Sequence, residues 1–141
     1  MSITVRKFDS GSLQQSLETQ DHGNGQPTIT DAEMISQCVV AALGDELLGI
    51  ILFGSVARGD ADEKSDIDLL VVVRRLTGCV LQTIKESVCD PGKRIVIQVT
   101  DLQELLGAIM ARDPFILGAF PGCKLLKDEG ILYALSEAVR L

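Results

Sequence analysis

The segment FGSVARGD at residues 53–60, followed by SDIDLL at residues 65–70, decides the fold of this 141-residue chain. Each piece adjoins an apolar run of strand length, residues 48–53 in one case and residues 67–73 in the other. Continuous apolar runs that are bounded by polar, glycine-containing turns are typical of strands buried on both faces of a sheet. The pattern therefore predicts two core strands joined by a polar turn.

The second of these strands begins with two carboxylates that are spaced for one face of the sheet. Side chains alternate along a strand, so Asp66 and Asp68 are expected to point the same way, roughly 6–7 Å apart at their Cα atoms, while Ile67 points into the core. Paired charges at the start of an apolar strand are costly unless a cation or ligand compensates them. Oxygen ligands of this kind suit Mg²⁺ or Mn²⁺. Asp66 and Asp68 are therefore the candidate metal ligands and catalytic residues.

The turn between the two strands has the features of a phosphate-binding loop. Gly54, at the end of the first strand, lets the backbone approach a ligand closely, and Ser55 and the amides after it offer hydrogen-bond donors to a phosphate. Arg58 supplies a positive charge for a phosphate or for a nearby carboxylate. A phosphate-binding turn beside a metal-binding carboxylate pair is suited to phosphoryl or nucleotidyl transfer.

Patterns outside this segment predict helices around the strands and a third strand. Thr30 and Glu33 have the spacing of a capping box, which predicts a helix that ends at Gly44. The other expected elements are helices at residues 79–88, 101–112 and 125–139 and a strand at residues 94–100. The expected fold class is α/β or α+β, with a small mixed β-sheet packed by helices.

The first part of the chain differs in composition from the rest. Residues 3–8 have the pattern of a short edge strand, but a stretch rich in Ser, Gln, Gly, Asp and Asn follows, and residues 21–27 form a turn-rich run without periodicity. We therefore predict a flexible N-terminal arm or linker at residues 1–29 and one folded domain, of ordinary domain length, at residues 30–141.

Composition and charge exclude several classes of protein. The chain is 46% hydrophobic and 23% charged, as average globular domains are, and its apolar runs are well short of a membrane span. Its 13 basic and 20 acidic side chains give a net charge of −7, which disfavours broad binding to nucleic acid. The N-terminal residues lack the pattern of a secretory signal. We expect an acidic, soluble, single-domain protein of the cytoplasm.

The cysteines and the single histidine offer little material for a zinc site. No two cysteines form a C-x-x-C pair, and one histidine is too few for a Cys/His site. Scattered cysteines in a chain without a secretory signal are typical of small buried side chains that stay reduced. We expect this of Cys38, Cys79, Cys89 and Cys123.

The pattern GSxARG at residues 54–59, followed by SDxDL at residues 65–69, resembles the signature of the minimal nucleotidyltransferases of the DNA polymerase beta superfamily. The order of elements over residues 31–100 also resembles that fold. In the family, the Gly-Ser pair holds the triphosphate and the two aspartates hold Mg²⁺. The resemblance therefore implies that a nucleoside triphosphate, ATP above all, binds here with Mg²⁺ or Mn²⁺. The nucleotide-binding residues would be Gly54, Ser55, Arg58 and Ser65, and the metal ligands Asp66 and Asp68.

The sequence departs from the family in one respect. Active members carry a third carboxylate on the next strand, where it completes the metal site and helps to activate the attacking hydroxyl, but residues 93–99 contain no Asp or Glu. Gln98 offers a neutral oxygen as a substitute and cannot serve as a base. Asp90 and Asp101, in the flanking turns, are the nearest carboxylates. Either one of them bends into the site, or the protein binds nucleotide and metal with weak or no transfer.

Three functions from different classes stay open. The first is an enzyme that transfers a nucleoside monophosphate to a hydroxyl acceptor and releases pyrophosphate. Small members of the family resemble antitoxins of toxin–antitoxin pairs, so a HEPN-domain RNase toxin would be the acceptor or partner. The second is a nucleotide-binding antitoxin without catalysis, which fits the acidic charge. The third is a transferase for a small molecule such as an antibiotic, whose acceptor pocket a homo-oligomer would have to supply.

Overall fold

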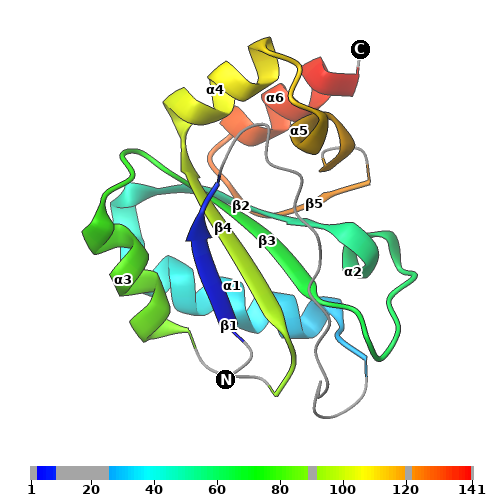
Figure 1. Cartoon of the computed structure of the whole chain (residues 1–141). Coiled ribbons are helices and arrows are strands. Elements are labelled where there is room, and N and C mark those ends of the chain that lie inside the picture. Colours follow the sequence, from blue (N-terminus) through cyan, green and yellow to red (C-terminus); the bar gives the residue numbers. More distant parts are fainter. Residues whose placement is uncertain (1–2, 9–25, 89–91, 120–121, 141) are drawn as a thin grey trace.

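The five strands of the sheet run in the order β1-β4-β3-β2-β5 in the computed structural model, which describes residues 3–8, 26–88, 92–119 and 122–140 (Figure 1). β4 pairs in parallel with β1 and β3, whereas β2 is antiparallel to β3 and β5. The strands are β1 (Ile3–Lys7), β2 (Leu47–Phe53), β3 (Ile67–Val73), β4 (Ile95–Asp101) and β5 (Lys124–Asp128). The helices are α1 (Ile29–Leu43), α2 (Gly54–Arg58), α3 (Gly78–Ser87), α4 (Leu102–Met110), α5 (Pro114–Ala119) and α6 (Ile131–Arg140), with a 3₁₀ turn at Gly44–Glu46. The predicted fold class, a small mixed sheet packed by helices, is confirmed.

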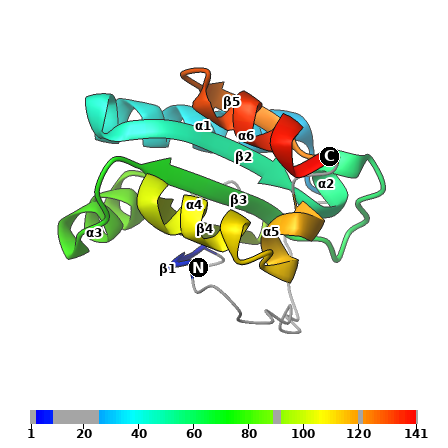
Figure 2. The ribbon, with the colours of Figure 1, turned by 90° about the horizontal axis from the view of Figure 1, so that it is seen from above.

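Each face of the sheet carries its own core cluster. In the view from above, α4, α5 and α6 lie over one face, and α1 and α3 lie beyond the sheet (Figure 2). Side chains of β3 alternate between the two clusters: Leu69 and Val71 pack with α1 and α3, whereas Leu70 and Val72 pack with α4, α5 and α6. By the same alternation, Asp68 occupies the next place on the second face, toward the beginning of β3.

The start of the first long helix differs from the prediction. α1 begins at Ile29, and its N-cap is Thr28 rather than Thr30. The Thr28 hydroxyl accepts a hydrogen bond from the Asp31 amide at 3.2 Å, and the Asp31 carboxylate accepts one from the Thr28 amide at 2.9 Å. An aspartate thus takes the part that was expected of Glu33 in the capping box. The end of the helix at Gly44 is as predicted.

The predicted C-terminal helix at residues 125–139 is wrong in its first part. Lys124–Asp128 form strand β5, which pairs with the outer edge of β2. A short run with two adjacent leucines does not distinguish strand from helix by its period, and the free edge of β2 decides between them. α6 then begins at Ile131, and the Asp128 carboxylate caps it by accepting hydrogen bonds from the amides of Gly130, Leu132 and Tyr133 at 3.0–3.1 Å.

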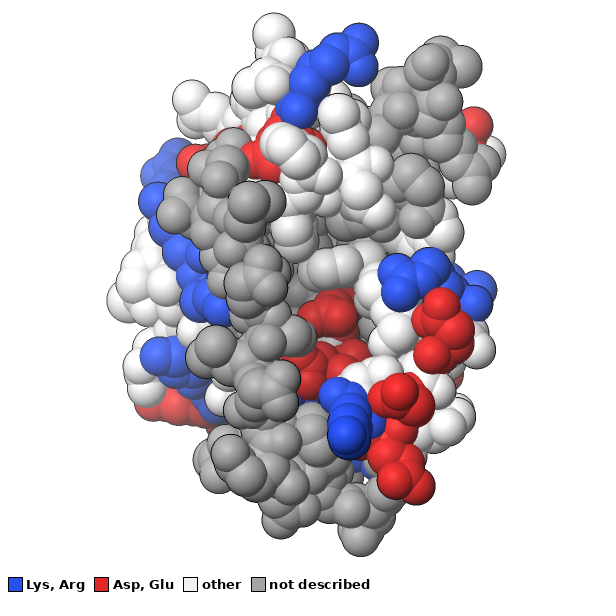
Figure 3. Space-filling view, turned by 45° about the vertical axis from the view of Figure 1, so that its right-hand side comes forward, with Lys and Arg blue, Asp and Glu red and all other residues white. Residues whose placement is uncertain are grey.

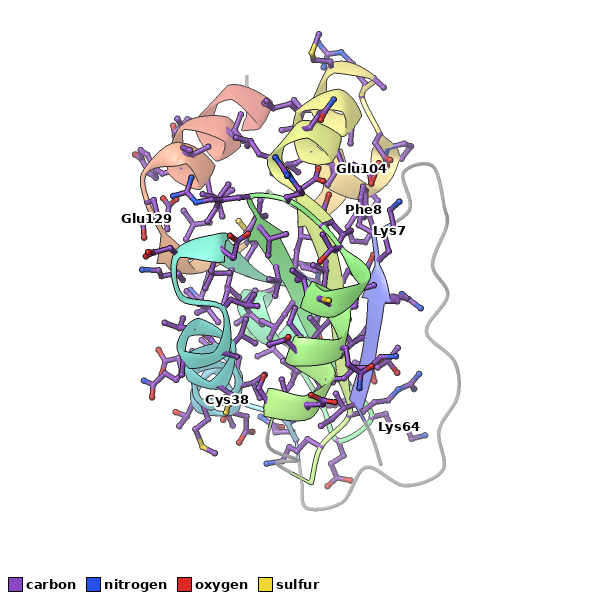
Figure 4. All side chains as sticks on the ribbon, turned by 90° about the vertical axis from the view of Figure 1, so that its left-hand side faces the viewer. Lys7, Phe8, Cys38, Lys64, Glu104 and Glu129 are labelled. Atoms are coloured by element: carbon purple, nitrogen blue, oxygen red, sulfur yellow. The ribbon has the colours of Figure 1, made fainter. Side chains whose placement is uncertain are left out.

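The expected edge strand at residues 3–8 forms β1, which pairs with β4. The Phe8 amide donates to the carbonyl of Val99 at 2.8 Å, and the Phe8 ring, 1% exposed, lies 5.4 Å from the ring of Phe115. Figure 4 shows Phe8 at the end of β1, beneath the helix that carries Glu104. β1 is therefore anchored to the sheet although it falls within the predicted arm at residues 1–29. Most of that arm, residues 9–25, lies outside the described residues.

The cysteines are less buried than predicted. Cys79 is exposed on α3, and Cys38 and Cys123 are half-buried. Cys89 lies outside the described residues. Among the helices that the structure describes, none combines the length and the apolar character that crossing a membrane requires.

Substitution of Gly49 tests the contact between α6 and the sheet, and substitution of Gly107 is the control. A Cβ on Gly49 would overlap the Leu132 side chain and lie 2.8 Å from the carbonyl oxygen of Lys127, whereas a Cβ on Gly107, in α4, would meet nothing within 4 Å. Gly49→Ala should therefore lower the free energy of unfolding by about 1–3 kcal/mol through overpacking. Gly107→Ala should raise it by about 0.5–1 kcal/mol. Urea denaturation followed by circular dichroism measures both changes. An unchanged free energy of unfolding in Gly49→Ala would contradict the packing of α6 on β2.

Candidate active site

Gly54 and Asp68 meet where β2 ends and β3 begins. Phe53, the last residue of β2, is the Cα partner of Asp68 in the antiparallel pair, so the turn starts beside that carboxylate. Gly54 has a φ of +80°, and a Cβ there would lie 2.6 Å from Asp68 Oδ2. Glycine is the residue that fits a left-handed and crowded position of this kind without displacing the carboxylate. The absence of a side chain at Gly54 therefore lets the backbone of the turn lie directly against the Asp68 carboxylate.

Asp66 and Asp68 form a pair of carboxylates that are largely withdrawn from water. Asp66 is 7% exposed and Asp68 is half-buried. Burial, and next the charge of Asp66, raises the pKa of Asp68 to about 7. Three arginines lower the pKa of Asp68 in the opposite direction, with effects that decrease in the order Arg6, Arg94 and Arg58. Because ionising both carboxylates together is costly, a divalent cation held by them would be bound favourably. Two carboxylates with a glycine backbone beside them thus fit Mg²⁺ or Mn²⁺.

Arg94 partly neutralises this pair. Its Nε lies 3.4 Å from Asp66 Oδ1, and both side chains are little exposed, 12% and 5%. The contact follows from the parallel register of β3 and β4, in which Ile67 is the partner of Ile95. The Ile67 amide also donates to the Arg94 carbonyl at 2.9 Å. The sequence analysis did not single out Arg94. Its place just before the third strand would have indicated it, had the register of the two strands been known.

The same register identifies the residue at the position where a third carboxylate would meet the pair. Val96 is the Cα partner of Asp68, whereas Gln98 is the partner of Leu70. Gln98, which is 4% exposed, shares the face of Asp68 but lies two residues further along, roughly 7 Å away in the strand direction. An apolar side chain therefore stands directly beside Asp68, and Gln98 is displaced from the place expected of a substitute.

The two carboxylates in the flanking turns do not fill this gap in the described structure. Asp101 lies at the far end of β4, opposite Val73, and its carboxylate caps α4 by accepting from the Glu104 amide at 2.9 Å. Asp90 lies outside the described residues. In the part of the chain that the structure describes, no group of three or more His, Cys, Asp or Glu side chains is placed to hold a metal ion. Within the described ranges, the acidic site is a pair.

The other predicted nucleotide-binding residues lie around this pair. Ser55 is half-buried in the first turn of α2. Arg58 is exposed, and its Nε lies 3.4 Å from Asp60 Oδ2, a surface ion pair that a ligand can replace at little cost. The Ser65 hydroxyl accepts from the Asp62 amide at 2.8 Å and donates to the Asp62 carboxylate at 3.2 Å, so it holds the loop that leads into Asp66.

The surface over this region is hollowed. Figure 3 shows acidic side chains at the bottom of a hollow, with basic and further acidic side chains at its border. The acidic side chains at the bottom of the hollow would repel a polyphosphate without a cation. A polyphosphate with a divalent cation can turn the cation toward these acidic side chains and its own negative charge toward the basic side chains at the border. The arrangement is therefore suited to a metal–nucleotide complex.

The chain belongs to the nucleotidyltransferase domain family, whose family model matches residues 35–105. A putative protein adenylyltransferase of Methanocaldococcus jannaschii is 32% identical in an alignment of 104 positions that covers 69% of this chain and 69% of that protein. A second putative protein adenylyltransferase of the same organism is 56% identical over 45 residues, 32% of this chain and 40% of that protein. The matched segment contains Gly54, Asp66, Asp68 and Arg94 but not strand β1.

Two solved structures are more distant. A putative nucleotidyltransferase from Sulfolobus solfataricus is 24% identical, with a TM-score of 0.44 over 56% of this chain and 71% of that chain. The spectinomycin adenyltransferase from Enterococcus faecialis, solved with ATP and spectinomycin, is 24% identical, with a TM-score of 0.45 over 57% of this chain and 36% of that chain. At this distance they add no argument about the site.

The raised pKa of Asp68 predicts a pH-dependent gain of stability when this carboxylate is removed. Because the pKa of Asp68 is about 7 in the native state and the ordinary pKa of an aspartate is 3.8, the native state binds the proton more tightly than the unfolded state does. The stability that Asp68 contributes is therefore lost as the pH rises from about 4 through 7. In the absence of metal, Asp68→Asn should gain stability over the natural protein between pH 5 and pH 8. The expected increase is on the order of 2 kcal/mol, since a tenfold change in proton affinity is worth about 1.4 kcal/mol.

Urea unfolding in EDTA across this pH range measures the gain. Asp45→Asn removes the same charge from an exposed turn at the opposite end of β2 and controls for net charge. A gain for Asp68→Asn that is independent of pH, or a loss of stability at pH 8, would show that the ionised carboxylate carries no such cost.

Proposed function

We propose that this protein binds a nucleoside triphosphate as its Mg²⁺ or Mn²⁺ complex and transfers the nucleoside monophosphate to a hydroxyl acceptor. The observation that carries the proposal is the close approach of the Gly54 backbone to the carboxylate of Asp68, which is half-buried beside the buried Asp66. Membership of the nucleotidyltransferase domain family supports the reaction class. Two relatives are named putative protein adenylyltransferases, and these names favour ATP as the nucleotide and a protein as the acceptor.

Each part of the site has a task in this reaction. Asp66 and Asp68 would hold the metal, and the backbone at Gly54 with the Ser55 hydroxyl would hold the triphosphate, with Arg58 at its border. The bound ion would polarise the α-phosphate and offset the charge of the leaving pyrophosphate. The acceptor oxygen forms a bond to the α-phosphorus, the bond to pyrophosphate breaks, and the hydroxyl proton passes to solvent.

A second candidate function is nucleotide binding with little or no transfer. Val96 beside Asp68 favours it, because the described site offers neither a third metal ligand nor a base for the acceptor hydroxyl. A HEPN-domain toxin, the partner implied by the sequence resemblance, would be the acceptor in the first case and a bound partner in the second. The cytoplasm, which supplies both MgATP and such a partner, stays the proposed compartment.

MgATP should raise the melting temperature of the protein. A ligand that binds the native state alone stabilises it by about 2.7 kcal/mol at a hundredfold excess over Kd. The double variant Asp66→Asn with Asp68→Asn should lose most of this shift, measured against its own melting temperature without ligand. MgGTP in place of MgATP tests the preference for the base.

A matched control removes two acidic side chains at the other end of β2. Asp45→Asn with Glu46→Gln changes the net charge by the same amount at exposed positions of the 3₁₀ turn, and it should keep the full shift. If the double variant of the site also keeps the full shift, the carboxylates do not hold the metal and the site assignment fails.

Transfer by the natural protein should be slow, and Val96→Asp should accelerate it. A base or third ligand beside Asp68 is worth about 10²–10⁴-fold in rate when it is well placed. Gln98→Glu introduces a carboxylate on the same strand but beside Leu70, and it should accelerate transfer less. Transfer of label from α-labelled ATP to candidate acceptors, a HEPN-domain protein among them, measures the rate. Fast transfer by the natural protein would show that the acceptor or Asp90 completes the site.

A further inference from the structure

Arg6 lies on the site face of the sheet although it comes from the N-terminal edge strand. Val5 packs in the core cluster under α1 and α3, so alternation places its neighbours Thr4 and Arg6 on the opposite face. In the parallel register of β1 and β4, Thr4 is the partner of Val96 and Arg6 is the partner of Gln98. Arg6 thus shares a face with Asp68, two strands away from it.

Arg6 is a half-buried cation without an acidic partner among the described residues. The ion pairs that the described residues form engage Arg58, Lys93, Arg94 and Lys127 instead. The charge of Arg6 nevertheless acts on Asp68. Burial and the charge of Asp66 raise the pKa of that carboxyl, and of the three arginines that lower it, Arg6 has the largest effect. A guanidinium that faces a site without pairing to a carboxylate is placed for an anionic ligand.

The position of Arg6 complements that of the phosphate-binding turn. Gly54 approaches Asp68 from β2, on one side of β3, and Arg6 approaches from β1, on the other side. Neighbouring strands lie about 4.8 Å apart, so roughly 10 Å separate β1 from β3. An extended arginine and a phosphate group together cover that distance. A nucleotide that begins at the turn and crosses the carboxylate pair therefore runs toward Arg6.

We propose that Arg6 binds a phosphate oxygen of the metal-bound nucleotide, so that strand β1 completes the nucleotide site from outside the family-matching residues 35–105. The inference rests on the proposed binding of a metal–nucleoside triphosphate complex. It makes Arg6 a positioning residue for the triphosphate, alongside the turn at Gly54.

Isothermal titration of MgATP into the natural protein and three variants tests this role. Arg6→Gln should weaken MgATP binding by about tenfold to a hundredfold, the range of a hydrogen bond to a charged group. Arg6→Lys keeps the charge but lacks the planar guanidinium, so its affinity for MgATP should lie between those of the natural protein and Arg6→Gln. Lys7→Gln makes the same charge change on the next residue, which is exposed and, by alternation, on the opposite face of β1; its MgATP affinity should stay within twofold of that of the natural protein.

Titration of Mn²⁺ alone separates a direct contact from an effect through the carboxylates. Removing a cation near Asp68 should leave Mn²⁺ binding unchanged or strengthen it, because the repulsion between the two cations is gone. Equal losses of Mn²⁺ and MgATP binding in Arg6→Gln, or MgATP binding within twofold of the natural protein, would overturn the role of Arg6. If the natural protein binds no MgATP, the proposed function itself fails. Circular dichroism of each variant verifies the fold.

Discussion

The repulsion between two carboxylates at the start of a buried strand organises this molecule. Asp66 and Asp68 share one face of β3, and burial together with their mutual charge makes ionising both of them unfavourable. Two neighbouring residues make this arrangement of carboxylates possible. Arg94 pairs with Asp66, and Gly54 leaves the Asp68 carboxylate room by having no side chain. The charge that remains would favour a divalent cation, so the cost of ionising the pair is also the physical basis of the metal binding that we propose.

Patterns that are local in sequence predicted the centre of the fold and the proximity of the two carboxylates. Bounded apolar runs located β2 and β3, and alternation placed Asp66 and Asp68 together. Features that depend on which strands become neighbours could not be predicted. The contact of Arg94 with Asp66, the position of Val96 beside Asp68 and the strand character of β5 all follow from pairing between distant segments. Local information also failed at α1, where two threonines two residues apart compete for the cap.

Val96 shows how stability and chemistry oppose each other in this site. A third carboxylate beside Asp68 would add a further like charge to a site in which the pKa of Asp68 is already about 7. A valine there, 8% exposed, adds no charge beside Asp68. Among the described residues, the site therefore retains the groups that we propose to hold one metal–phosphate complex and lacks one that would help an acceptor hydroxyl to attack. This balance favours binding over rapid turnover.

The same reasoning explains why an edge strand outside the family-matching residues belongs to the site. β1 is held at the sheet by its parallel pairing with β4 and by Phe8, whose ring packs on Phe115 and whose amide bonds to Val99. Once Phe8 and Val5 are buried, the alternation of the strand leaves Arg6 no choice of face. Core packing at one end of β1 thus fixes the direction of a charge near its middle. Because the described residues supply two carboxylates rather than three, a further cation on that face would strengthen the proposed hold on phosphate, where a third acid would have strengthened the hold on metal.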